Sequence, residues 1–167
     1  LLSLATAATT EEIPYVQEAV VNALQADANK SKRIEQLAAN LSLEDNKQVA
    51  FLFPIFAGAG DDKALPLVQQ ALNTASNREI AINTLANWSE PAALPSLIAL
   101  SREEKSTSLN VVLAGLVKQV NGSTATPEQK TLYLKDAFEQ AESSAQKRTI
   151  LQSLQATGTF QALMFAG

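Results

Sequence analysis

The chain has 167 residues, of which 46% are hydrophobic and 5% aromatic, and its formal net charge is -4. It contains no Cys and no His, which excludes a thiolate nucleophile, a Cys/His zinc site and a Ser-His-Asp triad within it. No cluster of Lys and Arg could neutralise a row of phosphates, so we expect no nucleic-acid partner.

Four capping-box patterns indicate helix starts along the chain. In such a box the side chain of a Ser or Thr cap residue accepts a hydrogen bond from the third helical N–H. The side chain of a Glu or Gln three residues later accepts one from the backbone N–H of the cap residue. The four pairs are Thr9 with Glu12, Ser76 with Glu79, Thr126 with Gln129, and Ser143 with Gln146. We expect a helix to begin near each of these pairs.

The apolar spacing is helical as well. Three stripes follow the i, i+3, i+4 pattern. They consist of Val49, Leu52, Phe53 and Phe56; of Leu109, Val112, Leu113, Leu116, Val117 and Val120; and of Leu134, Ala137, Phe138 and Ala141. No sustained period-two run occurs, and the longest apolar run, residues 49–59, is too short to span a bilayer. The sequence therefore predicts an all-α fold of about eight or nine helices joined by short loops.

A repeat of about thirty residues underlies these helices. Ala64-Leu65-Pro66-Leu67-Val68 matches Ala93-Leu94-Pro95-Ser96-Leu97 at an offset of 29 residues, and Ile13-Pro14-Tyr15-Val16 follows the same pattern. The apolar positions of the second helices recur too, in the sets Ala81, Ile82, Leu85 and Val112, Leu113, Leu116. Two helices per repeat predict an α-α superhelix of about four to five helix pairs. The helices near residues 44–57, 76–88, 107–120 and 145–156 should then lie side by side in one layer.

The motif A-L-P-x-[LV], followed by an apolar second helix, resembles the HEAT family, and most closely the short repeats of bilin-lyase-like proteins. The resemblance covers residues 43–122 well and the flanking residues loosely. It implies a single HEAT-like repeat domain over residues 1–167. The Asp and Arg that the family often carries in the turn and the second helix are represented by Asn77-Arg78 and, less clearly, by Lys147-Arg148.

The composition of the chain, rich in Asn, Gln, Thr and Ala, resembles that of helical repeat segments attached to sugar-processing domains of exported bacterial proteins. That resemblance implies a periplasmic or cell-surface location in preference to the cytoplasm, and a larger parent protein.

The two ends of the chain are unusually apolar for a superhelix, whose outer faces are normally polar. The side chains concerned are Leu1, Leu2 and Leu4 at one end and Phe160, Leu163, Met164 and Phe165 at the other. We expect them to be covered by neighbouring helices or by a second copy of the chain, and we interpret the chain as a fragment of a longer protein.

Adjacent acidic residues occur four times, as Glu11-Glu12, Glu44-Asp45, Asp61-Asp62 and Glu103-Glu104. Neighbours on a helix point about 100° apart, so such pairs suit helix caps better than the facing carboxylates of a glycosidase. Gly58 and Gly60 lack the Lys and the strand of a phosphate-binding loop. We expect no catalytic residue, no cofactor and no metal.

The candidate binding residues are polar side chains of the second helices, expected on the concave face of the superhelix, together with one Trp. They are Lys47, Gln48, Arg78, Glu79, Asn83, Trp88, Asn110, Lys118, Lys147, Arg148 and Gln152. Their mixed charge favours a protein or an uncharged polymer as partner. Trp88 either stacks on a ligand or closes an apolar stripe in the core, and Arg78 either contacts a ligand or bonds turn carbonyls.

Three functions remain open at this point. The first is a non-catalytic protein-interaction or spacer module. The second is an accessory helical domain of a multidomain bacterial glycoside hydrolase. The third, a bilin-lyase-like enzyme, is implied by the family resemblance alone.

Overall fold

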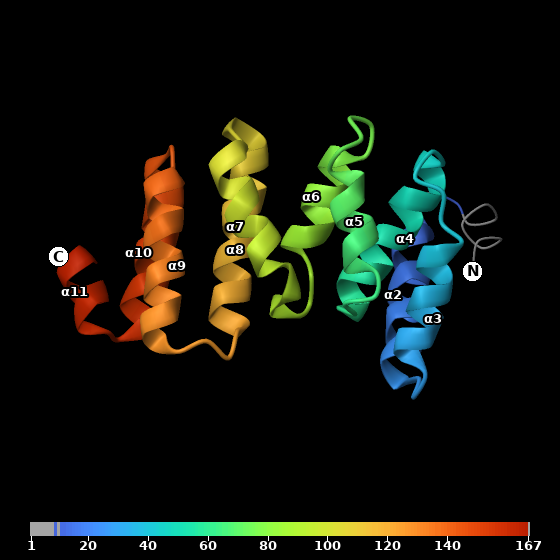
Figure 1. The fold of residues 1–167 in the computed structure, drawn as a ribbon, viewed down its shortest axis with the longest axis horizontal. Coiled ribbons are helices and arrows are strands. Elements are labelled where there is room, and N and C mark those ends of the chain that lie inside the picture. Colours follow the sequence, from blue (N-terminus) through green and yellow to red (C-terminus); the bar gives the residue numbers. More distant parts are fainter. Residues whose placement is uncertain (1–8, 10, 167) are drawn as a thin grey trace. The chain divides into compact units, whose positions relative to one another are not determined.

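The computed structural model describes residue 9 and residues 11–166 (Figure 1). This part of the chain contains ten α-helices, one short 3-10 helix and no strand, which confirms the predicted all-α class. Within the same residues, no helix combines the length and the apolarity needed to cross a membrane.

The chain divides after Ser89 into two compact units. The first contains α2 (Ile13–Ala26), α3 (Lys30–Ala39), α4 (Asn46–Ala59), α5 (Leu65–Ala71) and α6 (Arg78–Ala86). The second contains the 3-10 helix η1 (Pro91–Ala93), α7 (Leu94–Glu103), α8 (Ser106–Gly122), α9 (Pro127–Gln140), α10 (Ser144–Thr157) and α11 (Phe160–Ala166).

Helix pairs build both units. In the first unit α5 packs on α6, and α4 contacts both α2 and α6. In the second unit α7 pairs with α8 and α9 with α10, while α8 also contacts α10 and α7 contacts α9. The expected side-by-side placement of second helices is thus found for α4 with α6 and for α8 with α10. The single layer of all four, and with it the superhelix, stays a prediction.

Two of the four predicted capping boxes are confirmed. Thr126 caps α9 and Ser143 caps α10, and in each box the Gln three residues later bonds back to the cap N–H. At Thr9 the helix begins one turn later than expected, at Ile13, and the Glu12 carboxylate accepts from the Thr9 N–H and hydroxyl.

The capping box predicted at Ser76 is wrong. α6 begins at Arg78, and its cap residue Asn77 makes no capping hydrogen bond. The Asn77 side chain is buried and instead donates from Nδ2 to the Leu43 carbonyl, 2.7 Å away. A tertiary hydrogen bond at the next residue therefore takes the place of the local cap.

α4 is the most deeply buried helix of the first unit. Eight of its fourteen residues are buried, including Phe53 and Phe56, whose ring centroids lie 6.4 Å apart. A narrow strip of the helix remains accessible, and it carries Lys47, Ala50, Pro54 and Gly58. This strip of mostly small residues positions the candidate site described below.

Pro54 lies inside α4, where it removes the N–H that would bond the Ala50 carbonyl. The Gln17 side chain of α2 supplies a substitute donor. Its Nε2 lies 3.3 Å from the Ala50 oxygen and 2.9 Å from the Phe51 oxygen. The proline is therefore compatible with a continuous helix because a neighbouring helix satisfies the one acceptor that it leaves open, the Ala50 carbonyl.

The carboxyl end of α4 is also tied to its neighbours. Gln25 Nε2 donates to the Gly58 carbonyl over 3.0 Å, and Lys30 Nζ donates to the Ala59 carbonyl over 3.2 Å. The helix then ends at Gly60, whose φ of 66° lies in the left-handed region that favours glycine. These bonds use carbonyls that no helical N–H reaches.

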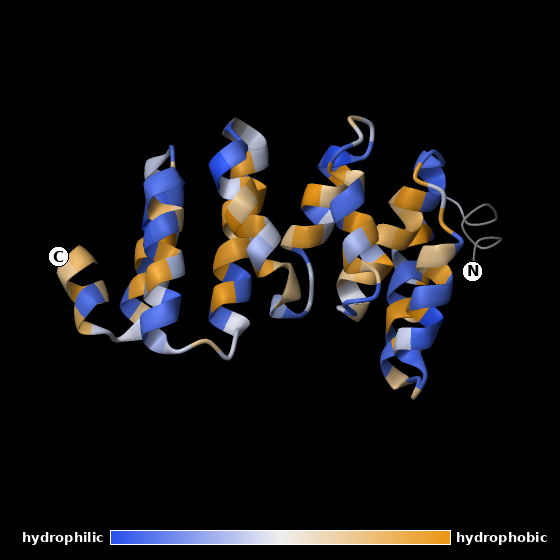
Figure 2. Cartoon of the chain, viewed as in Figure 1, coloured by the Kyte–Doolittle hydropathy of each residue, from blue (hydrophilic) through white to orange (hydrophobic). Residues whose placement is uncertain are grey.

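The expectation that the apolar C-terminal side chains find cover within the chain is wrong for three of them. Phe160, Leu163 and Met164 of α11 are 76%, 59% and 70% exposed. Phe165 is half-buried against Phe138 of α9. Figure 2 colours most residues of α11 as hydrophobic. Leu1, Leu2 and Leu4 lie outside the described residues.

Candidate binding grooves

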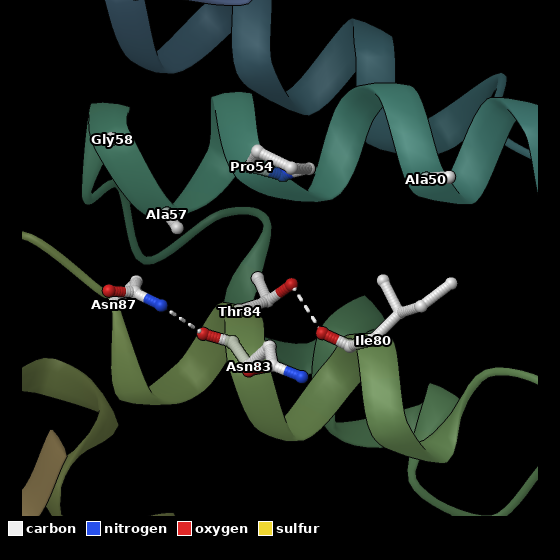
Figure 3. A pocket seen from close by; sticks show the side chains of 8 residues that line it. All are labelled: Ala50, Pro54, Ala57, Gly58, Ile80, Asn83, Thr84 and Asn87. Atoms are coloured by element: carbon white, nitrogen blue, oxygen red, sulfur yellow. Dashed lines mark hydrogen bonds between the residues drawn. The ribbon is translucent and has the colours of Figure 1, made fainter. Parts of the chain in front are cut away.

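A hollow of about 450 Å³ opens between α4 and α6 in the first unit (Figure 3). We call it the α4–α6 groove. Its lining residues are Ala50, Pro54, Ala57 and Gly58 from α4, and Ile80, Asn83, Thr84 and Asn87 from α6 and its end. The volume is within the range of about 300–1,000 Å³ that is usual for ligand sites.

The α4 side of the groove is open because its residues are small. Ala50, Pro54, Ala57 and Gly58 follow each other at helical spacing, so they share one face of α4. A larger side chain at Ala50 would fill the space opposite α6. The hollow thus follows from a local run of small residues.

The α6 side of the groove is polar, and its hydrogen bonds are local. Thr84 Oγ1 donates to the Ile80 carbonyl over 2.7 Å, and Asn87 Nδ2 donates to the Asn83 carbonyl over 2.9 Å (Figure 3). Asn83 Nδ2 in turn donates to the Glu79 carbonyl over 2.9 Å. Asn83 and Asn87 are exposed residues at the rim of the groove.

A second, smaller hollow of about 200 Å³ lies between α8 and α10 in the second unit. We call it the α8–α10 groove. It is lined by Asn110, Leu113, Ala114 and Val117 from α8, and by Ala145, Gln146, Thr149 and Ile150 from α10. Both grooves therefore lie between consecutive second helices, and both combine small or apolar side chains with amides.

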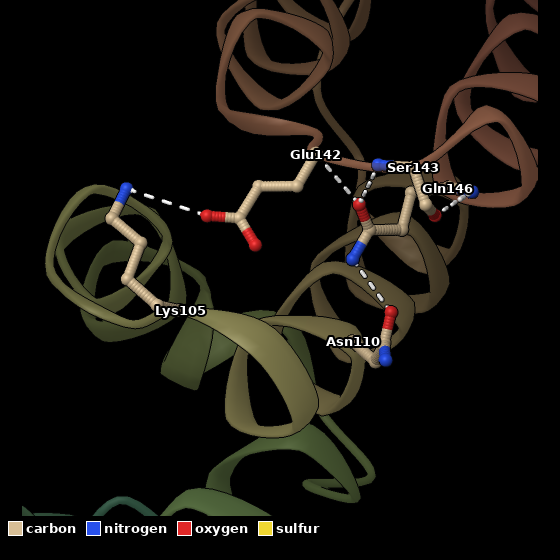
Figure 4. A network of polar contacts seen from close by, with 5 residues as sticks. All are labelled: Lys105, Asn110, Glu142, Ser143 and Gln146. Atoms are coloured by element: carbon tan, nitrogen blue, oxygen red, sulfur yellow. Dashed lines mark hydrogen bonds and ion pairs between the residues drawn. The ribbon is translucent and has the colours of Figure 1, made fainter.

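Gln146 joins the two helices of this second groove (Figure 4). Its Oε1 accepts from the N–H groups of Glu142 and Ser143 over 2.7 and 2.8 Å, which completes the capping box of α10. Its Nε2 donates to Asn110 Oδ1 of α8 over 2.6 Å. The Lys105 ammonium lies 3.8 Å from the Glu142 carboxylate, an exposed pair that adds little stability.

Neither groove has a charged side chain in its lining. Of the carboxylates predicted as caps, Asp45 caps α4, whereas Asp61 precedes α5 without capping it and Glu12 makes no side-chain cap hydrogen bond to α2. Asp45 accepts from the N–H groups of Lys47 and Gln48 over 3.0 and 3.1 Å, and Asp61 accepts from the Lys63 N–H over 3.0 Å and from the Ser31 hydroxyl. Among the described residues, no three metal-ligating side chains cluster together.

Hydrogen bonds perturb two exposed carboxyl groups outside the grooves. The Asn29 N–H, followed by the Arg33 side chain, lowers the pKa of Asp27 below its ordinary value. The Thr9 N–H and hydroxyl lower the pKa of Glu12. Both shifts come from turns at helix starts. A lowered pKa favours the ionised carboxylate, so neither Asp27 nor Glu12 is suited to donate a proton to a substrate.

Of the eleven candidate binding residues, Asn83 lines the α4–α6 groove and Asn110 lines the α8–α10 groove. Lys47, Glu79, Lys118, Arg148 and Gln152 are exposed elsewhere on their helices. The candidates are thus brought to two separate grooves and several other surface positions.

Four further candidates have structural contacts. Trp88 is fully buried, as its core interpretation expects, and Gln48 is half-buried with its Oε1 enclosed. Arg78 Nη1 donates to the Leu72 carbonyl over 2.8 Å, which is the turn-carbonyl role. Lys147 Nζ lies 5.4 Å from the centre of the Phe138 ring.

The small residues of the grooves were missed by sequence reasoning, which looked for polar side chains alone. On α4 they stand at positions 50, 54, 57 and 58, an i, i+4, i+7, i+8 pattern of Ala, Pro and Gly. That stripe was visible beside the apolar one. This stripe of small residues indicates the face of α4 that lines the groove, just as the Asn residues do for α6.

No family model, no curated protein and no solved structure matches the chain. The HEAT-like resemblance therefore stays a prediction.

Proposed function

We propose that the chain is a non-catalytic, HEAT-like binding module whose α4–α6 groove receives an extended segment of a partner protein. The observation that carries the proposal is the composition of the groove. Small apolar residues of α4 face exposed amides of α6 across a hollow of about 450 Å³, without a charged group in the lining.

The exposed amides favour a peptide main chain as the ligand. A peptide in extended conformation presents N–H and C=O groups at regular spacing, and Asn side chains can donate to and accept from them. One small apolar side chain of the ligand would then lie over Ala50 and Pro54. This arrangement gives orientation through hydrogen bonds and affinity through apolar contact.

A carbohydrate fits this groove less well. Sugar rings are commonly held on exposed aromatic faces, and none of the lining residues is aromatic. Trp88, the single Trp of the chain, is buried. The accessory role beside a glycoside hydrolase would therefore need a different surface.

Selection of peptides from a random phage-displayed library against the purified chain tests the proposal. Ala50→Trp fills the groove, and we expect it to weaken binding of the selected peptides at least about tenfold, or about 1.4 kcal/mol. Ala19→Trp is the matched control, because Ala19 is exposed on α2 and does not line the groove.

NMR titration completes this test. A selected peptide should shift the resonances of Ala50, Ile80 and Asn83. Peptides that bind both Trp variants equally well would contradict the proposal. Shifts at these residues caused by oligosaccharides, with none caused by peptides, would favour the accessory carbohydrate role instead.

A further inference from the structure

The outward side of α11 forms an apolar face, which we call the α11 face and define as Phe160, Leu163 and Met164. These three residues stand at i, i+3 and i+4, so they lie on one side of the helix. They are among the five large hydrophobic side chains that are exposed in the described part of the chain. Leu132, on the adjacent helix α9, is a fourth.

The opposite side of α11 is held against α9 and α10, which determines where the α11 face points. Ala162 is fully buried. The Phe165 ring meets the Phe138 ring edge-on, with 5.1 Å between the centroids, and Lys135 Nζ lies 5.1 Å from the centre of the Phe165 ring. Thr159, just before the helix, contacts the Thr131 hydroxyl of α9 over 2.9 Å.

The α11 face is complementary to itself. No residue between Phe160 and Ala166 is charged, so two copies of the helix can approach without repulsion. If they meet antiparallel about a two-fold axis, Phe160 of one copy faces Met164 of the other, and the two Leu163 side chains meet near the axis. The contact of a thioether sulfur with an aromatic ring is favourable.

The area of the face agrees with a weak dimer. The three side chains expose on the order of 400 Å² of apolar surface, which is the size of the largest apolar patch on a typical monomer and is often functional. Two such faces with their surroundings would bury on the order of 1,000 Å², at the lower limit of specific interfaces. An association at this limit is reversible and depends on protein concentration.

We propose that the α11 face is a self-association surface, and that its occupant is the α11 face of a second copy of this chain. This goes beyond the proposed function, because the α4–α6 groove and the α11 face share no residue. Either proposal can fail without the other.

Sedimentation velocity on the full chain, from about 1 to about 300 µM, tests the proposal. The unchanged chain should shift from monomer to dimer across this range. Leu163→Lys places a charge at the centre of the interface and should raise the dissociation constant at least about tenfold. Tyr15→Lys is the matched control, because Tyr15 is 75% exposed on α2 and lies outside the face.

Cross-linking gives an independent readout, because the chain has no Cys of its own. Under mild oxidation Leu163→Cys should form a covalent dimer, and Tyr15→Cys should not. Circular dichroism checks that all variants are folded. A chain that stays monomeric over the whole range, or a dimer that Leu163→Lys and Tyr15→Lys weaken equally, would overturn the proposal.

Discussion

At the scale of single residues, Pro54 and Gln17 depend on each other. The proline leaves the Ala50 carbonyl without its helical donor, and the Gln17 amide reaches that carbonyl and the next one from α2. A pair of this kind is suited to a double-mutant cycle.

Gln17→Ala should destabilise the chain by about 1 kcal/mol, because it removes the donor of the Ala50 carbonyl, which has no replacement within the helix. In a Pro54→Ala background, residue 54 regains its N–H, and the loss caused by Gln17→Ala should shrink by about half. Urea denaturation of the four proteins measures both effects. An unchanged loss in the two backgrounds would show that Gln17 acts independently of the proline.

Gly58 makes the contact between α4 and α2 possible. A Cβ atom at this position would lie 2.8 Å from Val21 Cγ2 and 3.0 Å from Cγ1. The branched Val side chain is restricted in χ1 and has little freedom to move away. α4 and α2 can therefore approach this closely because residue 58 has no side chain.

Gly58→Ala should destabilise the chain by about 1–2 kcal/mol, since overpacking outweighs the better helix propensity of Ala. With Val21→Ala also present, the same change should become neutral or stabilising. Thermal unfolding measures both. Gly122→Ala is the control, because a Cβ at Gly122 meets nothing within 4 Å. Equal losses at Gly58 and Gly122 would rule out the steric explanation.

At the scale of helices, the turn between α2 and α3 is sensitive to pH through Asp27. Its carboxylate accepts from the Asn29 N–H over 2.7 Å and from Arg33 Nε over 3.2 Å. These bonds lower the pKa of Asp27 in the folded chain. Their stabilisation is therefore present above the ordinary pKa of Asp and is lost as the pH falls through the lowered value.

Asp27→Asn should lower the melting temperature slightly at neutral pH, and the difference from the unchanged chain should disappear at acidic pH, once Asp27 itself is protonated. The effect is small because the pair is exposed to solvent. Melting curves across the acidic range measure it. Asp62→Asn, at an exposed Asp before α5, serves as the control, and the same pH profile for both variants would contradict the assignment.

Helix starts were predictable where the cap and its partner three residues later bond each other in the folded chain. The boxes at Thr126 and Ser143 are of this kind. The start of α6 was not, because Asn77 bonds a carbonyl 34 residues away, which no local pattern contains. The same distinction between local and long-range determinants applies to the grooves. The amides Asn83 and Asn110 were predicted, whereas the space beside them depends on which helices become neighbours.

At the scale of the whole molecule, we expect no catalytic turnover. The chain has neither His nor Cys, and none of the residues lining the two grooves is ionisable. General acid-base chemistry needs such a group within hydrogen-bond reach of a bound substrate.

Purified chain incubated with a panel of glycosides should therefore show no hydrolysis above the rate without protein. Any turnover should persist unchanged when single acidic residues are replaced, which would identify it as contamination. Turnover that one Asp→Asn or Glu→Gln change abolishes would refute the expectation.

The buried Thr131 hydroxyl belongs to a hydrogen-bond network that has more contacts than protons. Three hydroxyls, those of Thr131, Thr157 and Thr159, have three protons for four contacts, which include the carbonyls of Pro127 and Leu154. In one arrangement the donors run from Thr159 through Thr131 and Thr157 to Leu154. In the other, Thr157 and Thr159 both donate to Thr131, which donates to Pro127.

The two arrangements differ in the positions of hydrogens alone, so the network can reverse its direction while every heavy atom stays in place. Either hydroxyl can be the donor in the contact between Thr131 and Thr159, so the link between α9 and the start of α11 survives a reversal of the network and is lost when Thr131 loses its hydroxyl.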